Sequence, residues 1–264
     1  MTITRPTFTI GVSLKMYFGL AETARWSKAV ARIAATHDAF ASGIVNAFVL
    51  PTFPAIASAR EAFAGTAVAI GAQNLHWEDS GAWTGEISGP VLRELGATYV
   101  EVGHAERRSA FGETDDIVAA KTAAALRNGL TPVLCVGEPE RVSAAEAAKW
   151  CVSEVRSALA DASAHGPLGR VVVAYEPRWA IGAAAPAHSE HIREVCDALR
   201  STLVAIGAHP GSTVIYGGSA RPGLLTQLDG AVDGLFLGRF AHNPVAVGQV
   251  LDEALALSRS TLVA

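Results

Sequence analysis

Residues 114–136 read TDDIVAAKTAAALRNGLTPVLCV and contain a complete helix-to-strand transition. Thr114 is a suitable N-cap, and the two aspartates behind it place negative charge in the first helical turn, where the helix dipole favours it. Asn128-Gly129 is a typical helix stop, and an apolar run of strand length follows it. The stretch therefore predicts a helix over residues 115–127 and then a buried β-strand.

The same alternation of short β-branched runs and longer Ala-rich stretches of helical period continues along the chain. Two further helices are predicted over residues 143–159 and 189–205. About eight strand–helix units in some 250 residues favour a (β/α)8 barrel of class α/β, and we expect one domain over residues 1–264. The turn after the first strand lacks the GxGxxG of a doubly wound dinucleotide fold. The eight strands are expected at residues 8–14, 44–50, 67–71, 98–102, 131–136, 171–175, 213–216 and 234–237.

The composition excludes several classes of protein. Of the 264 residues, 50% are hydrophobic and 17% are charged, with a formal net charge of -4, so the chain can form a large core and is not disordered. The most apolar stretch, residues 43–57, contains Pro51 and Pro54 and is shorter than the ~20 residues of a membrane span. Without a dense cluster of Lys and Arg, neither nucleic acid nor a membrane surface is an expected partner.

The three cysteines, Cys135, Cys151 and Cys196, are scattered and odd in number, which indicates neither a disulfide framework nor a zinc site. His188 and His191 stand three residues apart, but no third ligand is evident, so we expect surface residues and no metal. Residues 1–8 carry no apolar segment or cleavage site, and the expected compartment is the cytoplasm.

Polar residues follow several of the predicted strands. Lys15 follows the first strand and His104 the fourth, while Glu176 follows the sixth. Glycine-rich turns follow the seventh and eighth strands, and such turns let backbone N–H groups approach an anion such as phosphate. Because the carboxyl ends of all barrel strands meet at one face, we predict an active site there that binds a small phosphorylated molecule.

Three segments carry a resemblance to a known family. Residues 102–108 read VGHAERR, residues 174–182 read AYEPRWAIG and residues 215–219 read IYGGS. With them, nearly the whole chain resembles the triosephosphate isomerase family, whose members are (β/α)8 barrels, also called TIM barrels. The segments GAQN at 71–74 and TGE at 84–86 resemble the family's third loop, which reaches into a partner subunit, so the resemblance implies a homodimer. It implies no cofactor.

The resemblance also implies roles for individual residues. Glu176 matches the base that removes a proton next to a carbonyl, and His104 and Lys15 match the groups that stabilise the resulting enediolate. Glu106 matches a residue beside the site lysine and is placed with the catalytic group. Residues 177–185 match a lid that closes over the substrate.

A phosphate site is implied by the same comparison. The backbone N–H groups of the lid and of the last two strand–helix turns are expected to surround the phosphate. On this basis we expect the substrate to be bound by Gly182, Gly217, Gly218, Ser219, Gly238, Ser13 and Arg239. The last two of these depart from the family pattern.

Several positions depart from the family's usual pattern. Ser13 stands where asparagine is usual, and Leu14 stands in place of tryptophan. The lid continues as Ala183-Ala184-Ala185 instead of Thr-Gly-Lys, and Arg239 replaces a glycine of the last phosphate turn. Intact catalytic residues within a changed surrounding indicate a changed substrate.

The smaller side chain at Ser13 makes room for one more hydroxymethyl group than a triose phosphate has. The leading hypothesis is therefore a cofactor-independent sugar-phosphate isomerase that converts L-erythrulose 1-phosphate to D-erythrulose 4-phosphate through an enediolate. The first alternative is the triose reaction, dihydroxyacetone phosphate to D-glyceraldehyde 3-phosphate. The second is a barrel that binds sugar phosphates without catalysis.

Overall fold

The computed structural model describes residues 8–164, 168–208 and 210–261. Eight parallel strands pair in chain order and close into a barrel, because β1 pairs with both β2 and β8. The expected (β/α)8 barrel is therefore confirmed. Residues 1–7, from which we argued against export, lie outside the described part. The strands are β1 (Phe8–Ser13), β2 (Val45–Leu50), β3 (Val68–Ala72), β4 (Tyr99–Val102), β5 (Thr131–Val136), β6 (Val172–Tyr175), β7 (Thr213–Tyr216) and β8 (Gly234–Leu237).

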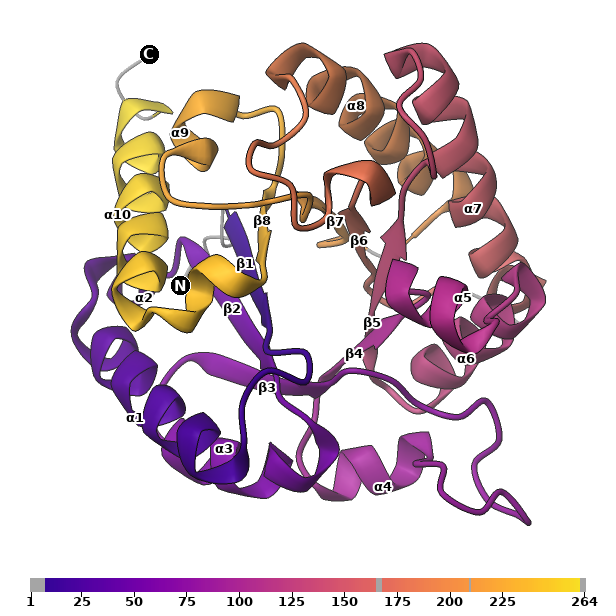
Figure 1. Cartoon of the computed structure of the whole chain (residues 1–264), viewed down its shortest axis with the longest axis horizontal. Coiled ribbons are helices and arrows are strands. Elements are labelled where there is room, and N and C mark those ends of the chain that lie inside the picture. The colour runs from indigo at the N-terminus through magenta and orange to yellow at the C-terminus, as the bar shows by residue number, and fades with distance from the viewer. Residues whose placement is uncertain (1–7, 165–167, 209, 262–264) are drawn as a thin grey trace.

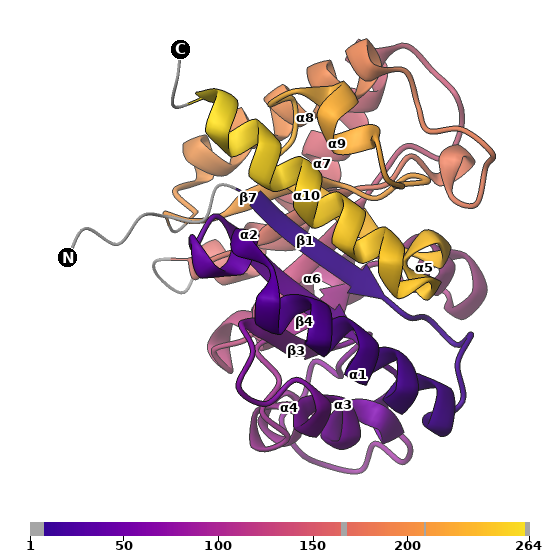
Figure 2. The same ribbon diagram turned by 90° about the vertical axis from the view of Figure 1, so that its left-hand side faces the viewer.

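Helices surround the strands as an outer ring, which Figure 1 shows along the barrel and Figure 2 from the side. Three short 3-10 helices, η1 (Phe53–Ala55), η2 (Arg178–Ala180) and η3 (Arg239–His242), lie in the connections. The α-helices are α1 (Leu20–Thr36), α2 (Asp38–Ala41), α3 (Ile56–Ala62), α4 (Gly89–Glu94), α5 (Ala105–Phe111), α6 (Asp115–Arg127), α7 (Ala144–Ala164), α8 (Ser189–Ile206), α9 (Leu224–Leu228) and α10 (Pro244–Thr261).

The predicted elements agree closely with the structure. Every strand lies within one residue of its expected bounds, and α6 has the expected bounds, with Thr114 accepting the N-cap hydrogen bond from the N–H of Ile117. The helix predicted over 143–159 was too short at its C-terminal end, because residues 160–164 (ADASA) contain no glycine or proline to end α7.

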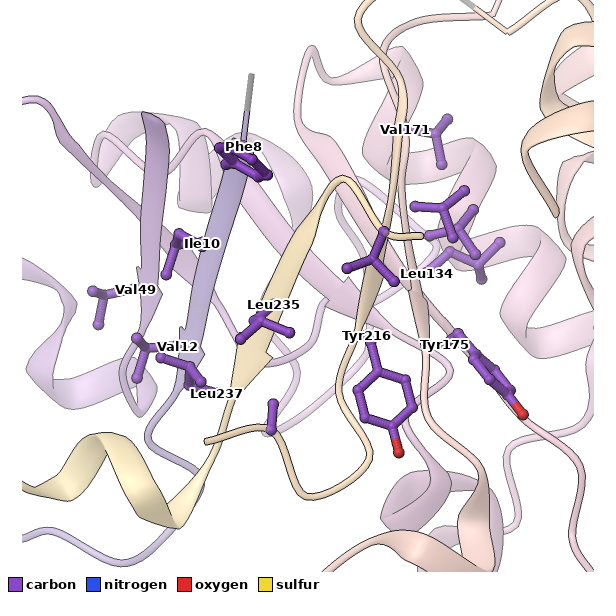
Figure 3. Close-up of a cluster of buried hydrophobic side chains, with 14 of the residues drawn as sticks. Phe8, Ile10, Val12, Val49, Leu134, Val171, Tyr175, Tyr216, Leu235 and Leu237 are labelled. Carbon is purple, nitrogen blue, oxygen red and sulfur yellow. The ribbon is translucent and has the colours of Figure 1, made fainter. Parts of the chain in front are cut away.

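Side chains alternate between two apolar layers along each strand. Ile10 and Val12 of β1 lie in the layer between barrel and helices, together with Leu235 and Leu237 of β8, and Figure 3 shows these four close to one another. The remaining positions of each strand point into the barrel. This alternation places Ser13 on the inner side, at the carboxyl end of β1.

Aromatic rings fill the barrel interior. Phe48 stacks on Tyr99, with ring centroids 4.4 Å apart, and lies 6.0 Å from the ring of Phe236. Gly11 provides the necessary space, because a Cβ there would lie 2.4 Å from Phe48 and 2.8 Å from Phe236. The interior is therefore packed rather than open, and polar chemistry is confined to the carboxyl ends of the strands.

No helix in the described ranges is long and apolar enough to cross a membrane. Within the same ranges, no cluster of three or more His, Cys, Asp or Glu side chains has the arrangement of a metal site.

Candidate active site

Lys15 lies two residues beyond the end of β1 and has an unusual backbone conformation. Its φ is 48°, in the left-handed region that side chains other than glycine rarely adopt. The Gln73 side chain supports this turn by donating one hydrogen bond to the Lys15 carbonyl and one to the Leu50 carbonyl, each 2.9 Å long. Strain of this kind is typical of functional sites, where the surrounding structure maintains it.

The Lys15 ammonium donates a 2.7 Å hydrogen bond to Oε1 of Glu106. Burial lowers the pKa of Lys15, but the hydrogen bond to Glu106 and the nearby charge of Glu176 outweigh it and place that pKa above the ordinary value. Burial raises the pKa of Glu106, and Lys15 more than compensates, so the pKa of Glu106 lies below its ordinary value. Both groups are therefore charged at neutral pH.

His104 is the N-cap of α5. Its Nδ1 accepts a 3.1 Å hydrogen bond from the backbone N–H of Glu106. Because an accepting Nδ1 carries no proton, the ring is the neutral tautomer with its proton on Nε2. His104 can thus donate a hydrogen bond from Nε2.

Glu176 follows β6 and is 6% exposed. Its backbone N–H donates to the Val136 carbonyl over 2.8 Å, which fixes the residue at the end of the strand. The carboxylate lies against Gly217, where an added Cβ would be 2.6 Å from Oε1. The absence of a side chain at Gly217 therefore lets the carboxylate occupy this position.

His104 Nε2 and Glu176 Oε2 lie 3.5 Å apart, and neither atom has a hydrogen-bond partner. Both residues line a cavity of about 710 Å³ at the carboxyl ends of the strands. A buried donor and a buried acceptor without partners are costly unless a ligand satisfies them. Most of the expected binding residues also line this cavity. The further lining residues include Ser13, Lys15, Glu106, Gly182, Gly217, Ser219, Gly238 and Arg239.

Residues 177–185, which we expect to form a lid, contact the loops after β7 and β8. Ser219 Oγ lies 2.7 Å from the Ala180 carbonyl oxygen and 2.8 Å from that of Ala183. The Arg239 guanidinium donates a 3.0 Å hydrogen bond to the Gly182 carbonyl. Arg239 thus contacts the lid, a position that the sequence did not indicate.

One expected binding residue lies outside the cavity lining. Gly218 is buried behind the wall, and a Cβ there would lie 2.6 Å from the Tyr216 hydroxyl oxygen and 3.0 Å from Pro177. Gly218 therefore gives the base of the lid room to pack against β7.

The expectation that His191 is a surface residue was wrong. Its ring is partly buried, with Nε2 3.0 Å from the Tyr175 hydroxyl oxygen and 3.4 Å from Oε1 of Glu138. The indole of Trp179 donates to the same Glu138 oxygen over 2.8 Å. Tertiary packing of α8 against the lid base, which helical spacing does not reveal, places the ring there. His188 is exposed as expected.

The sequence reasoning also missed Glu101 on β4. This carboxyl group is 3% exposed, and its Oε2 accepts a 3.0 Å hydrogen bond from the Ser13 hydroxyl. Burial raises the pKa of Glu101, although the hydrogen bond from Ser13 acts in the opposite direction. The available signal was a glutamate in the middle of an otherwise uncharged strand, TYVEV at residues 98–102.

Comparison with known proteins agrees with this geometry. A sequence model of the family described as "Triosephosphate isomerase" matches residues 8–254. The chain belongs to the triosephosphate isomerase family. Among solved structures of the family, the triosephosphate isomerase of Bartonella henselae superposes with a TM-score of 0.77 at 26% identity, covering 94% of this chain and 98% of that one.

Curated relatives within this family carry a more specific name. The L-erythrulose-1-phosphate isomerase of Pectobacterium atrosepticum is 52% identical over 250 residues, covering 95% of this chain and 96% of the relative. The protein of the same name from Mesorhizobium japonicum is 38% identical over 256 residues, with coverage of 96% and 99%.

Proposed function

We propose that the protein is a sugar-phosphate isomerase that needs no cofactor and converts L-erythrulose 1-phosphate to D-erythrulose 4-phosphate. The reaction moves a carbonyl from C2 to C3 of a four-carbon chain, numbered from the phosphate end. Two relatives that match almost the whole chain bear the name of this activity. The small Ser13 side chain at the cavity wall leaves space for the hydroxymethyl group at C4.

In the proposed mechanism, Glu176 Oε2 removes the proton from C3, and the electrons of that C–H bond form an enediolate across C2 and C3. His104 Nε2–H donates to the enediolate oxygens and mediates proton transfer from O3 to O2. The Lys15 ammonium stabilises the negative charge. The proton held by Glu176 then returns to C2, and the carbonyl is left at C3.

The phosphate group is proposed to bind at the opposite end of the cavity. Gly182, Ser219 and Gly238 line this part, and glycine-rich turns can bring backbone N–H donors close to an anion. Closure of the lid would exclude water from the enediolate and so oppose loss of phosphate from it.

The observation that carries the proposal is the pair of unsatisfied atoms, His104 Nε2 and Glu176 Oε2, 3.5 Å apart at the cavity. An acceptor that can take a proton from carbon, beside a neutral donor and a lysine ammonium, is the set of groups that enediolate chemistry needs. A barrel that only binds sugar phosphates would not require an unpaired carboxylate at this place.

The test is proton NMR of the purified protein in D₂O with L-erythrulose 1-phosphate and, in parallel, dihydroxyacetone phosphate. We expect D-erythrulose 4-phosphate to form with deuterium at the former C2, faster than any product from the triose phosphate. Faster turnover of dihydroxyacetone phosphate would assign the triose reaction instead. Binding of both phosphates without deuterium uptake would assign a non-catalytic barrel.

We also propose that the protein is a homodimer. The loop between β3 and α4 extends beyond the helical ring (Figure 1) and carries Trp83, which is 46% exposed, while Met16 and Tyr17 are exposed beside the cavity mouth. Light scattering coupled to size-exclusion chromatography would show twice the chain mass of 27.4 kDa.

The cytoplasm is the proposed compartment. Cys135, Cys151 and Cys196 are free, buried thiols, which suits a reducing environment. Fractionation of cells that produce the protein would test this location.

A further inference from the structure

Glu101 occupies a position where a carboxyl group is unexpected. Side chains alternate along β4, and Tyr99, two residues earlier, stacks inside the barrel on Phe48. Glu101 therefore also points into the barrel, one level nearer the active site. Isolated buried carboxyl groups are rare because desolvation penalises them, so this one needs a compensating role.

The contacts of Glu101 connect it to the cavity through a single residue. Oε2 accepts the hydrogen bond from Ser13, and Oε1 lies 3.9 Å from the thiol sulfur of Cys135. Among the described residues, Glu101 forms no direct ion pair, and the charge of Lys15 acts on it only at longer range. Its partner Ser13 lines the cavity, whereas Glu101 itself lies beneath the wall.

Glu101 is also on the side of the barrel away from the proposed phosphate site. In a closed barrel of eight strands in chain order, β4 lies opposite β8, whose following loop contains Gly238. Ser13 ends β1, the strand that pairs with β8, and its hydroxyl meets Glu101 across the barrel. A ligand whose phosphate lies at Gly238 and whose reacting carbons lie at His104, just beyond β4, therefore has its far end on the side of Glu101. In a tetrulose phosphate, that far end is the hydroxymethyl group at C4.

We propose that Glu101 is a positioning residue that orients the Ser13 hydroxyl, and that the two form a subsite for the terminal hydroxymethyl group of the substrate. This inference rests on the proposed function. While the Ser13 hydroxyl donates its proton to Glu101, the lone pairs of Oγ remain available to accept a hydrogen bond from the substrate hydroxyl. Without Glu101, the hydroxyl would rotate among several directions.

The chemical environment of the Glu101 carboxyl group is consistent with this arrangement. Burial raises the pKa of Glu101 and the nearby charge of Glu176 adds to this, so the net shift is upward although Lys15 and the hydrogen bond from Ser13 act in the opposite direction. A raised pKa favours the protonated form, which limits the repulsion between Glu101 and the nearby Glu176 carboxylate. In either state an oxygen of Glu101 can accept the hydrogen bond from Ser13.

The test compares three variants with the full-length wild type. Glu101→Val introduces a β-branched, strand-compatible side chain and removes the acceptor, whereas Glu101→Gln provides an amide oxygen that can accept from Ser13. Val172→Ala is the matched control, because it alters the same inner apolar layer at a side chain that makes no polar contact with Ser13, Glu101 or Glu176. Kinetic constants are measured with L-erythrulose 1-phosphate, together with the inhibition constant of inorganic phosphate.

For Glu101→Val we expect kcat/KM to fall by about 30-fold, mainly through KM, which is the size of one lost oriented hydrogen bond to a substrate hydroxyl. Glu101→Gln should stay within about 3-fold of wild type. Inhibition by inorganic phosphate should not change in Glu101→Val or Glu101→Gln, because the Glu101 carboxyl group on β4 lies across the barrel from the proposed phosphate site. Val172→Ala should leave the KM of L-erythrulose 1-phosphate unchanged.

Three outcomes would overturn the subsite. They are an unchanged KM in Glu101→Val, equal losses in Glu101→Val and Val172→Ala, or weaker inhibition by phosphate in parallel with the weaker substrate binding. If Glu101→Val does not fold, Ser13→Ala provides the same test and should show the same rise in KM. A wild-type protein that does not convert L-erythrulose 1-phosphate would refute the proposed function itself, and this is seen before any variant is compared.

Discussion

Gly217 offers a direct test of how tightly the catalytic carboxylate is placed. In the variant Gly217→Ala, the new Cβ would lie 2.6 Å from both Cγ and Oε1 of Glu176. Ordinary contact begins near 3.4 Å, so the carboxylate has to move by about 0.8 Å, the difference between the two distances. Gly217 is not among the residues with positive φ, so its backbone accepts alanine without strain.

A displacement of that size is large for a base that has to reach a proton on carbon. Misplacement by about 1 Å can cost about 10²-fold in rate, equal to about 2.7 kcal/mol in the activation barrier. We therefore expect kcat for L-erythrulose 1-phosphate to fall by about 10²-fold while the melting temperature changes little. Steady-state kinetics and thermal denaturation measure the two quantities.

Gly19→Ala is the matched control for this substitution. Gly19 has a φ of -73°, and an added Cβ would meet nothing within 4 Å, so kcat should equal that of the wild type. In the Gly217→Ala background, Glu176→Asp should cost less than it does alone, because the shorter side chain does not meet the new methyl group. A Gly217→Ala enzyme with wild-type kcat would show that the carboxylate is not held by this contact, and our account of its placement would be wrong.

Three further variants test other contacts. Glu176→Asp alone should lower kcat by about 10²-fold and KM much less, because the base retracts from the substrate; a loss confined to KM would contradict the role as base. Arg239→Gln should raise KM about 3- to 10-fold by releasing the lid carbonyl, and unchanged kinetics would show that this contact is dispensable. Lys121→Met should cost about 3 kcal/mol in urea unfolding at pH 7, because the buried carboxylate of Glu113 loses a partner 2.5 Å away. Burial raises the pKa of Glu113, but Lys121 and Arg107 hold it below the ordinary value of 4.5, so this difference should persist above pH 4.5 and shrink as the pH falls further. An equal difference at pH 3 and pH 7 would refute that assignment.

The barrel could be predicted from the sequence because its signals are local. Each strand is a short apolar run, and α6 has a recognisable cap at Thr114 and a stop at Asn128. The order of strands follows from parallel pairing of consecutive units. The C-terminal end of α7 was missed because the sequence there contains no local stop signal before residue 165.

The candidate site could be predicted only in part. Lys15, His104 and Glu176 follow strands directly, so a barrel brings them to one face, and the structure places all three around one cavity. The hydrogen bond between Ser13 and Glu101 joins residues 88 positions apart on strands that are not neighbours. Such contacts depend on the closed register of the barrel, which no local pattern contains.

The packed interior of the barrel determines the route by which substrate enters the active site and product leaves it. Phe48, Tyr99 and Phe236 fill the barrel beneath the cavity, so the cavity is reached from the face at the carboxyl ends of the strands, where residues 181–184 line it. A product molecule has to leave by the route through which the next substrate enters. Product release and substrate binding therefore use the same opening of the cavity. D-erythrulose 4-phosphate should accordingly act as a competitive inhibitor with respect to L-erythrulose 1-phosphate.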